Sequence, residues 1–218
     1  RTAAHINLSG DLSGYLGGAN RTGFTTVTDP ALGDVLRLEV LEATSDPYVY
    51  FRAGDLLREN EITLDADEYK YMVLLYRADP ANNTDRMNLY LCAGLITGPT
   101  EDCNRGVTLA RDGKWHYLLV DLSEQANWDG IIHGWRFDYL SGDSDAGDRG
   151  DFASVQFFRT AKAARKLAEQ DPLSKEPYKT GDPIVIKDMS EEQNEEDNSF
   201  VLDPDDTYEI TEAPAEPS

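Results

Sequence analysis

An acidic stretch near the middle of the chain has the residue types of a calcium loop. Residues 141–151 read SGDSDAGDRGD, with glycines spaced among the acids. Calcium takes six to eight oxygen ligands, and glycines let a loop turn carboxylates and carbonyls toward one ion. The candidate calcium ligands are Asp143, Asp145, Asp148 and Asp151. The loop lacks the glutamate and flanking helices of an EF-hand, so a solvated turn is the alternative.

A charged pair follows from the segment WRFD. Successive side chains of a strand point to opposite faces, so Arg136 and Asp138 share the face opposite Trp135 and Phe137. Two interpretations stay open. The pair is a structural ion pair, or it is the polar floor of a ligand site.

Aromatic rings near this pair suit a sugar, because a ring can cover the apolar face of a pyranose while hydroxyls form hydrogen bonds. The predicted ligand-binding residues are Tyr48, Tyr50, Trp135, Arg136, Asp138 and Tyr139. For Trp135 and Tyr139 a place in the core is the alternative, since alternation puts them on the side of Phe137.

The sequence carries no recognisable catalytic motif. None of the histidines, His5, His116 and His133, belongs to an H-E-x-x-H pattern, and no G-x-S-x-G elbow occurs. The E-x-D-x-E strand pattern of sandwich-fold glucanases and a glycine-rich phosphate loop are also absent from the sequence. Binding is therefore favoured over catalysis. A β-sandwich glycoside hydrolase or lyase stays an alternative, because 41 acids always supply candidate carboxylate pairs.

The charge of the chain limits its partners. The formal net charge is -21, and residues 166–218 hold sixteen acidic against four basic residues. Such an excess of acid repels nucleic acids and anionic membrane surfaces. No apolar run approaches the roughly 20 residues that span a bilayer. We expect no nucleic acid partner and no membrane insertion, while calcium, cationic partners and neutral sugars stay open.

Strand patterns fill the first 165 residues. Alternating or continuous apolar runs, separated by turns rich in Gly, Asp, Asn and Pro, predict strands at residues 35–43, 48–51, 69–77, 87–92, 115–122, 131–139 and 152–158. The run at 69–77 is longer and mostly apolar, which indicates a central strand buried on both faces. Only residues 160–170 look helical.

These elements predict an all-β protein, an antiparallel β-sandwich of the jelly-roll type with a short C-terminal helix. Residues 1–165 form the sandwich in this interpretation. Residues 166–218 form the end of the helix and an acidic tail, partly disordered because it holds too few apolar residues to offset the entropy of ordering.

The two cysteines, Cys92 and Cys103, flank residues typical of turns, so a disulfide across a loop is predicted, with two free thiols as the alternative. A disulfide suits an oxidising compartment, so we expect an extracellular protein, secreted or attached to the cell surface.

Four pieces of the chain, taken in order, resemble a known type of domain. They are SDPYVYF at 45–51, ADEYKYMVLLYR at 66–77, DGKWHYLLVDLS at 112–123, and NWDGIIHGWRFDYLSG at 127–142 leading to FASVQFFRT at 152–160. Together they resemble the carbohydrate-binding-module-like jelly-roll domains of large secreted or surface proteins of Gram-positive, often gut-dwelling, bacteria. The resemblance covers residues 34–164, and it departs from the common pattern where Trp135 replaces an aliphatic residue before the R-x-D.

The resemblance implies a sandwich, an extracellular setting and glycan binding. With the residues above, it predicts a non-catalytic glycan-binding module of a multidomain extracellular bacterial protein, with calcium as its one candidate cofactor. The module is expected to be monomeric, and its expected partner is a glycan or cell-surface polysaccharide. A structural or adhesive spacer that binds a protein partner is the first alternative.

Overall fold

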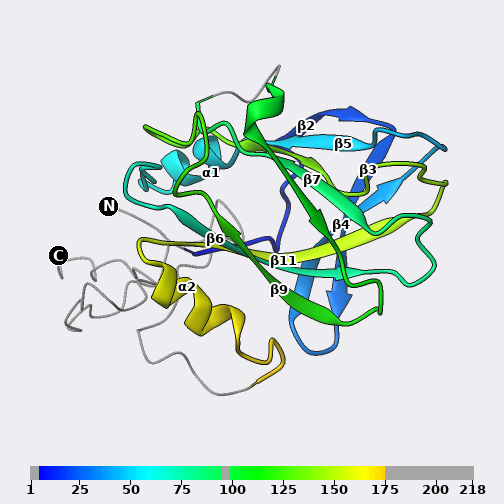
Figure 1. Ribbon diagram of the computed structural model, residues 1–218. Helices are drawn as coiled ribbons and strands as arrows, with labels where there is room; N and C mark the ends of the chain where they lie inside the picture. The colour runs from blue at the N-terminus through cyan, green and yellow to red at the C-terminus, as the bar shows by residue number, and fades with distance from the viewer. Residues whose placement is uncertain (1–4, 95–98, 175–218) are drawn as a thin grey trace, which may run out of the picture.

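Two antiparallel β-sheets pack face to face in this computed structural model, which describes residues 5–94 and 99–174 (Figure 1). The predicted all-β sandwich is confirmed. The predicted acidic tail lies, from residue 175 onward, outside the described residues.

The first sheet has six strands, with β11 at its centre. Its strands are β1 (His5–Asn7), β3 (Thr22–Asp29), β4 (Gly33–Val40), β6 (Tyr71–Ala78), β9 (Trp115–Asp121) and β11 (Arg149–Phe158). The order is β3-β4-β11-β6-β9, and β1 also pairs with β11. A register shift between Phe152 and Ser154 divides β11, so that β4 pairs with its first half and β1 with its second.

The second sheet has five strands in the order β2-β5-β10-β7-β8. They are β2 (Leu16–Asn20), β5 (Tyr48–Phe51), β7 (Arg86–Tyr90), β8 (Asn104–Thr108) and β10 (Trp135–Asp138). The core lies between the two sheets, where Val49, Phe51, Leu89, Trp135 and Phe137 are at most 1% exposed. Strand alternation leaves the other face of this sheet to polar and tyrosine side chains.

Each of the seven predicted strands appears, with β5 at its predicted bounds and β6 between β11 and β9 as expected of a central strand. The prediction at 131–139 was too long, because only residues 135–138 form β10. Sequence reasoning missed β1, β2, β3 and β8. It also missed α1 (Ala53–Glu59), a helix of seven residues that follows β5 and buries Leu56 and Leu57.

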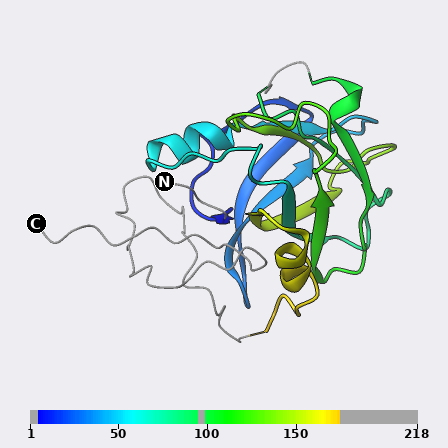
Figure 2. The same ribbon diagram turned by 60° about the vertical axis from the view of Figure 1, so that its left-hand side comes forward.

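The predicted C-terminal helix is α2 (Ala161–Ala168), shorter than expected. Thr160 caps it by accepting a hydrogen bond from the backbone N–H of Ala163. Its Ala163 and Leu167 pack on Val73 and Phe158, on the outer side of the six-stranded sheet (Figure 2). The predicted domain boundary between residues 165 and 166 therefore falls inside a helix that is packed on the sandwich. Among the described residues, no helix has the length and apolar content to cross a membrane.

Cys92 and Cys103 form the predicted disulfide. Both residues are buried, with Cα atoms 5.3 Å apart. Cys92 lies shortly after the end of β7. Cys103 ends a single turn of 3-10 helix (Glu101–Cys103) and directly precedes β8. The disulfide therefore fixes the two strands at one edge of the five-stranded sheet.

Candidate functional site

Three neighbouring strands bring a set of tyrosine and polar side chains together on the outer face of the five-stranded sheet. We call this set the tyrosine face: Tyr48 and Tyr50 on β5, Arg136 and Asp138 on β10, and Asn88 and Tyr90 on β7. The register places Arg136 opposite Tyr50 on one side and opposite Tyr90 on the other. Four of the six predicted ligand-binding residues thus lie together.

Asp138 holds the guanidinium of Arg136 in a fixed plane. Arg136 Nε donates to Asp138 Oδ1 over 2.6 Å, and Nη2 donates to Oδ2 over 2.7 Å. Both carboxylate oxygens are thereby engaged, and Asp138 is only 2% exposed. A two-point contact of this kind adds directional order to the attraction between the charges.

Tyrosine rings surround the same guanidinium. The Cζ atom of Arg136 lies 4.2 Å from the ring centroid of Tyr48, 4.4 Å from that of Tyr90 and 5.8 Å from that of Tyr50. Tyr48 and Tyr90 come from the strands on either side of β10, so the cation is held between them. Contacts of this type stabilise the arrangement by about 0.5–2 kcal/mol each, depending on desolvation.

Burial changes the acid–base properties of these groups. Desolvation raises the pKa of Asp138 to about 6; Arg136 opposes this rise, and the negative charge of Asp46 adds to it. Burial lowers the pKa of Arg136, but the hydrogen bond and charge of Asp138 outweigh burial and raise it above its ordinary value. Burial, with the hydrogen bond to Glu101, raises the pKa of Tyr90 to about 12. At neutral pH the Arg136–Asp138 pair is therefore ionised and its net charge is close to zero.

Hydrogen-bonding groups line the β7 and β8 side of the face. The Tyr90 hydroxyl donates to Glu101 Oε1 over 2.8 Å, and Asn88 Nδ2 donates to Ser141 Oγ over 2.7 Å. The Oδ1 atoms of Asn88 and Asn104 are buried and have no hydrogen-bond partner. A buried acceptor without a partner is costly, so a bound hydroxyl would satisfy a real need there.

Two glycines keep room for these side chains. A Cβ atom on Gly18 would lie 2.7 Å from Cδ2 of Tyr50, and one on Gly106 would lie 3.0 Å from Oδ1 of Asn88. Sequence reasoning missed Asn88, Tyr90 and both glycines as parts of the site. Alternation along RMNLY was the available signal for Asn88 and Tyr90, since it sets them opposite the apolar residues of β7.

The predicted roles of Trp135 and Tyr139 in ligand binding are wrong. Both side chains are fully buried between the sheets. The ring of Trp135 packs edge-on against Phe51, with centroids 5.1 Å apart, and the Tyr139 hydroxyl shares a hydrogen bond with Oγ1 of Thr22. The pleat that turns Arg136 outward turns these two rings into the core.

The acidic loop does not gather its four carboxylates. Asp148 is buried and accepts hydrogen bonds from the backbone N–H groups of Asn83 and Asp145, whereas Asp143 and Asp145 are exposed. Asp151 lies on β11, so its predicted place beside the other three is wrong. In the described part of the chain no three His, Cys, Asp or Glu side chains are placed to hold a metal ion.

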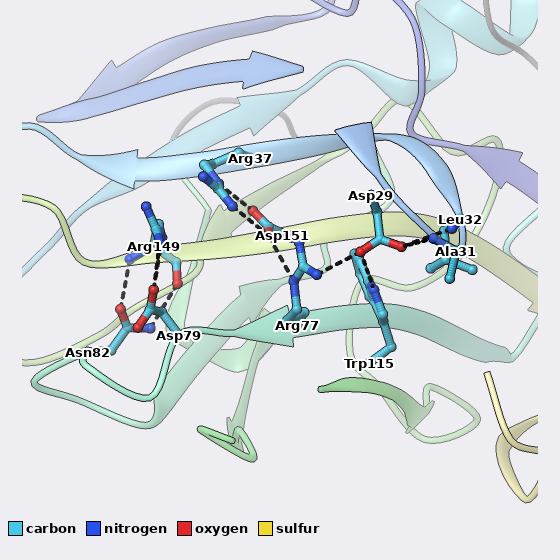
Figure 3. Close-up of polar contacts among 10 residues, drawn as sticks. All are labelled: Asp29, Ala31, Leu32, Arg37, Arg77, Asp79, Asn82, Trp115, Arg149 and Asp151. Carbon is cyan, nitrogen blue, oxygen red and sulfur yellow. Dashed lines mark hydrogen bonds and ion pairs between the residues drawn. The ribbon is translucent and has the colours of Figure 1, made fainter. Parts of the chain in front are cut away.

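Asp151 instead belongs to an ion-pair network on the outer face of the six-stranded sheet (Figure 3). Its oxygens accept from Arg37 Nε at 2.7 Å and from Arg77 Nη2 at 2.7 Å. Arg77 also pairs with Asp29, which accepts a hydrogen bond from Trp115 Nε1. These contacts connect β3, β4, β11, β6 and β9 and give the network a structural role.

Comparison with known proteins yields similarity of fold. No protein-family model matches the chain, and no curated protein matches it. A low-affinity xylan-binding module from the gut symbiont Roseburia intestinalis is 10% identical with a TM-score of 0.42, over 66% of this chain and 89% of that one. A family 11 carbohydrate-binding module from Clostridium thermocellum, solved with a mixed-linked tetrasaccharide, is 13% identical with a TM-score of 0.42, over 72% and 96%.

A glycoside hydrolase domain is among the similar structures. It is that of Endo-D from Streptococcus pneumoniae, 11% identical with a TM-score of 0.46, over 68% of this chain but 22% of that one. Identities this low say nothing about what this chain binds, so a function must be argued from its own side chains.

Proposed function

We propose that this chain is a non-catalytic glycan-binding module that holds a neutral sugar chain on the tyrosine face. The observation that carries the proposal is the guanidinium of Arg136, which lies between Tyr48 and Tyr90 and is fixed there by the two hydrogen bonds that it donates to Asp138. A sugar ring presents hydroxyls at its edge and C–H groups on its faces. The ordered tyrosine rings match the C–H groups of the sugar face, and the ordered hydrogen-bond donors and acceptors beside them match the hydroxyls of its edge.

The charges around the face favour a neutral ligand. The charge of Arg136 is matched by that of Asp138, and the exposed acids Asp46 and Glu101 lie near the face. A uronic acid or a sulfated sugar would meet net repulsion there. Neutral hexose or pentose chains bring no such penalty.

Asp138 has the wrong environment for an acid of a glycoside hydrolase. Its pKa of about 6 would suit proton transfer, and the carboxyl of Asp46 is near enough to raise that pKa. Both oxygens of Asp138, however, already accept hydrogen bonds from Arg136. We therefore assign Asp138 the role of positioning Arg136.

The setting we propose is a multidomain extracellular protein of a bacterium. The disulfide between Cys92 and Cys103 supports an oxidising compartment. Calcium at Asp143 and Asp145, both exposed on the acidic loop, stays a prediction that the binding experiment can include.

Isothermal titration calorimetry of the full chain tests the proposal, with xylotetraose, cellotetraose and mixed-linked glucan tetrasaccharide, each with calcium and with a chelator. We expect saturable binding of at least one neutral sugar. Tyr48→Ala should weaken it about tenfold, the equivalent of about 1.4 kcal/mol. Tyr71→Ala, on the other sheet, is the matched control and should bind like the wild type.

Three outcomes separate the alternatives. Absence of binding by the wild type to every sugar and to the corresponding polysaccharides would contradict glycan binding and leave the spacer function. Equal weakening by Tyr48→Ala and Tyr71→Ala would contradict the tyrosine face. Release of reducing ends from the polysaccharides would favour a hydrolase.

A further inference from the structure

A concave surface lies on the outer face of the other sheet. It is a groove of about 530 Å³ lined by residues of β1, β4, β6, β9 and β11 and by the chain segment after α2. The two sheets pack face to face (Figure 1). The groove and the tyrosine face lie on the outer faces of different sheets and therefore on opposite sides of the sandwich. Its size falls within the range of small-molecule sites, roughly 300–1,000 Å³.

One wall of the groove carries polar side chains that are buried. Gln156 lies opposite His5 and Ser154 opposite Asn7, across the β1–β11 pairing. Gln156 is 3% exposed and Ser154 is 5% exposed. All pairings of the strand that carries them, β11, are antiparallel. The outer face of an antiparallel sheet usually carries polar side chains that contact water, so the unusual feature of Gln156 and Ser154 is their burial.

Two buried polar atoms of this wall have no hydrogen-bond partner. They are Oε1 of Gln156 and Oγ of Ser9, both on residues that line the groove. Buried polar atoms in folded proteins are nearly always paired, and each exception needs a reason such as a bound ligand. A hydroxyl group in the groove could donate to Gln156 Oε1 and form a hydrogen bond with Ser9.

An adjoining part of the groove lining is apolar. Val35, Leu75 and Ala153 form a buried cluster there, with Leu32 and Tyr117 packed beside them, and all five line the groove. A ligand that fits this lining presents both hydroxyls and C–H groups. The phenol ring of Tyr117 adds an aromatic surface of the kind that covers a sugar face.

The charged groups of the groove exclude anions. Asp34 and Asp171 line it, and neither Lys nor Arg occurs among the described residues that do. A phosphate, sulfate or uronate would meet these two carboxylates and, among the described lining residues, no Lys or Arg to pair with. An uncharged polyhydroxylated ligand fits these walls.

We propose that this groove is a second carbohydrate site, which takes a neutral saccharide of one or two rings. The proposal stands apart from the function assigned to the tyrosine face, since the two sites share no residue. With both sites filled, one module would bind two sugar chains, one on each side of the sandwich.

The test is a ¹H–¹⁵N NMR titration of the full wild-type chain with xylobiose and cellobiose, and with digalacturonic acid as the anionic control. We expect saturable shifts of the backbone amides of Ser154 and Gln156 with at least one neutral disaccharide, and none with the acid. Gln156→Leu should weaken this binding at least tenfold. The melting temperature of the Gln156→Leu variant should equal or exceed that of the wild type, because the substitution removes the buried Oε1 atom that has no hydrogen-bond partner.

Tyr48→Ala is the second control and separates the two sites. Loss of the tyrosine-face shifts in this variant, with the groove shifts retained, supports two independent sites. Groove amides that do not respond to either neutral disaccharide would overturn the proposal, whatever happens at the tyrosine face. Nuclear Overhauser contacts between Gln156 and residues 175–218 would also overturn it, since the chain itself would then fill the groove.

Discussion

The carboxylate of Asp138 and the guanidinium of Arg136, two residues apart on β10, meet through two hydrogen bonds of 2.6 and 2.7 Å. Because residues two apart on a strand share a face, the pair needs no other element to bring it together. The strands on either side then add the rings of Tyr48 and Tyr90. A local pairing therefore orders a site whose remaining parts come from distant segments.

The raised pKa of Asp138 predicts a specific dependence of stability on pH. Its pKa is 3.8 ordinarily and about 6 in the folded chain, so the native state binds this proton more tightly than the unfolded state. The contribution of Asp138 to the free energy of unfolding should be greatest below about pH 4, fall as the pH rises to about 6, and stay level above. Urea unfolding from pH 4 to 7.5 measures it.

Asp138→Asn provides the comparison, because other carboxyls titrate in the same range. The difference in free energy of unfolding, wild type minus variant, should fall between pH 4 and 6 and then level off. A difference that rises over this interval would contradict the assigned direction of the shift.

Arg136→Met should raise the pKa of Asp138 above its value of about 6. The guanidinium is the group that holds this pKa down, and without it the buried carboxylate keeps only the desolvation penalty and the charge of Asp46. The ¹³C chemical shift of the Asp138 carboxyl carbon, followed against pH, reports the change. Arg86→Met, an exposed arginine on the neighbouring β7, should leave the titration unmoved.

The sequence predicted the sandwich well but only the central part of the site. Alternation in WRFD placed Arg136 and Asp138 on one face, because period two is a local property of the strand. Strand β3 was missed because TGFTTVTD, with its four threonines, lacks a continuous apolar pattern. The partners of Asp151 could not be predicted, since Arg37 and Arg77 come from strands 114 and 74 residues away in the chain.

Replacing both cysteines by serine should destabilise the fold by about 3 kcal/mol. Cys92 and Cys103 are 11 residues apart, and the chain-entropy model gives about this value for a loop of that size. Chemical unfolding of the double variant measures the loss. Wild type unfolded in the presence of a reductant should show the same unfolding midpoint as the double variant. If both midpoints equal that of the untreated wild type, the result argues against the bond.

Asp151→Asn should cost about 3–5 kcal/mol, the range for removing one partner of a buried ion pair. Asp151 is 3% exposed, and its loss leaves Arg37 and Arg77 without their shared carboxylate. Asp143→Asn replaces an exposed acid of the neighbouring loop and should change the stability by less than about 0.5 kcal/mol. Equal effects of the two variants would show that the network in Figure 3 has no special role.

Gly18→Ala should disturb the tyrosine face from its edge. Gly18 has a φ of 55°, in the left-handed region, and a methyl group there would lie 2.7 Å from Cδ2 of Tyr50. The backbone cost is about 1 kcal/mol, and the ring of Tyr50 must also move to relieve the contact. Gly17→Ala is the matched control, because a methyl group on Gly17 meets no atom within 4 Å. Unfolding by urea should separate the variants by at least about 1 kcal/mol, and equal stabilities would show that Tyr50 does not lie against β2.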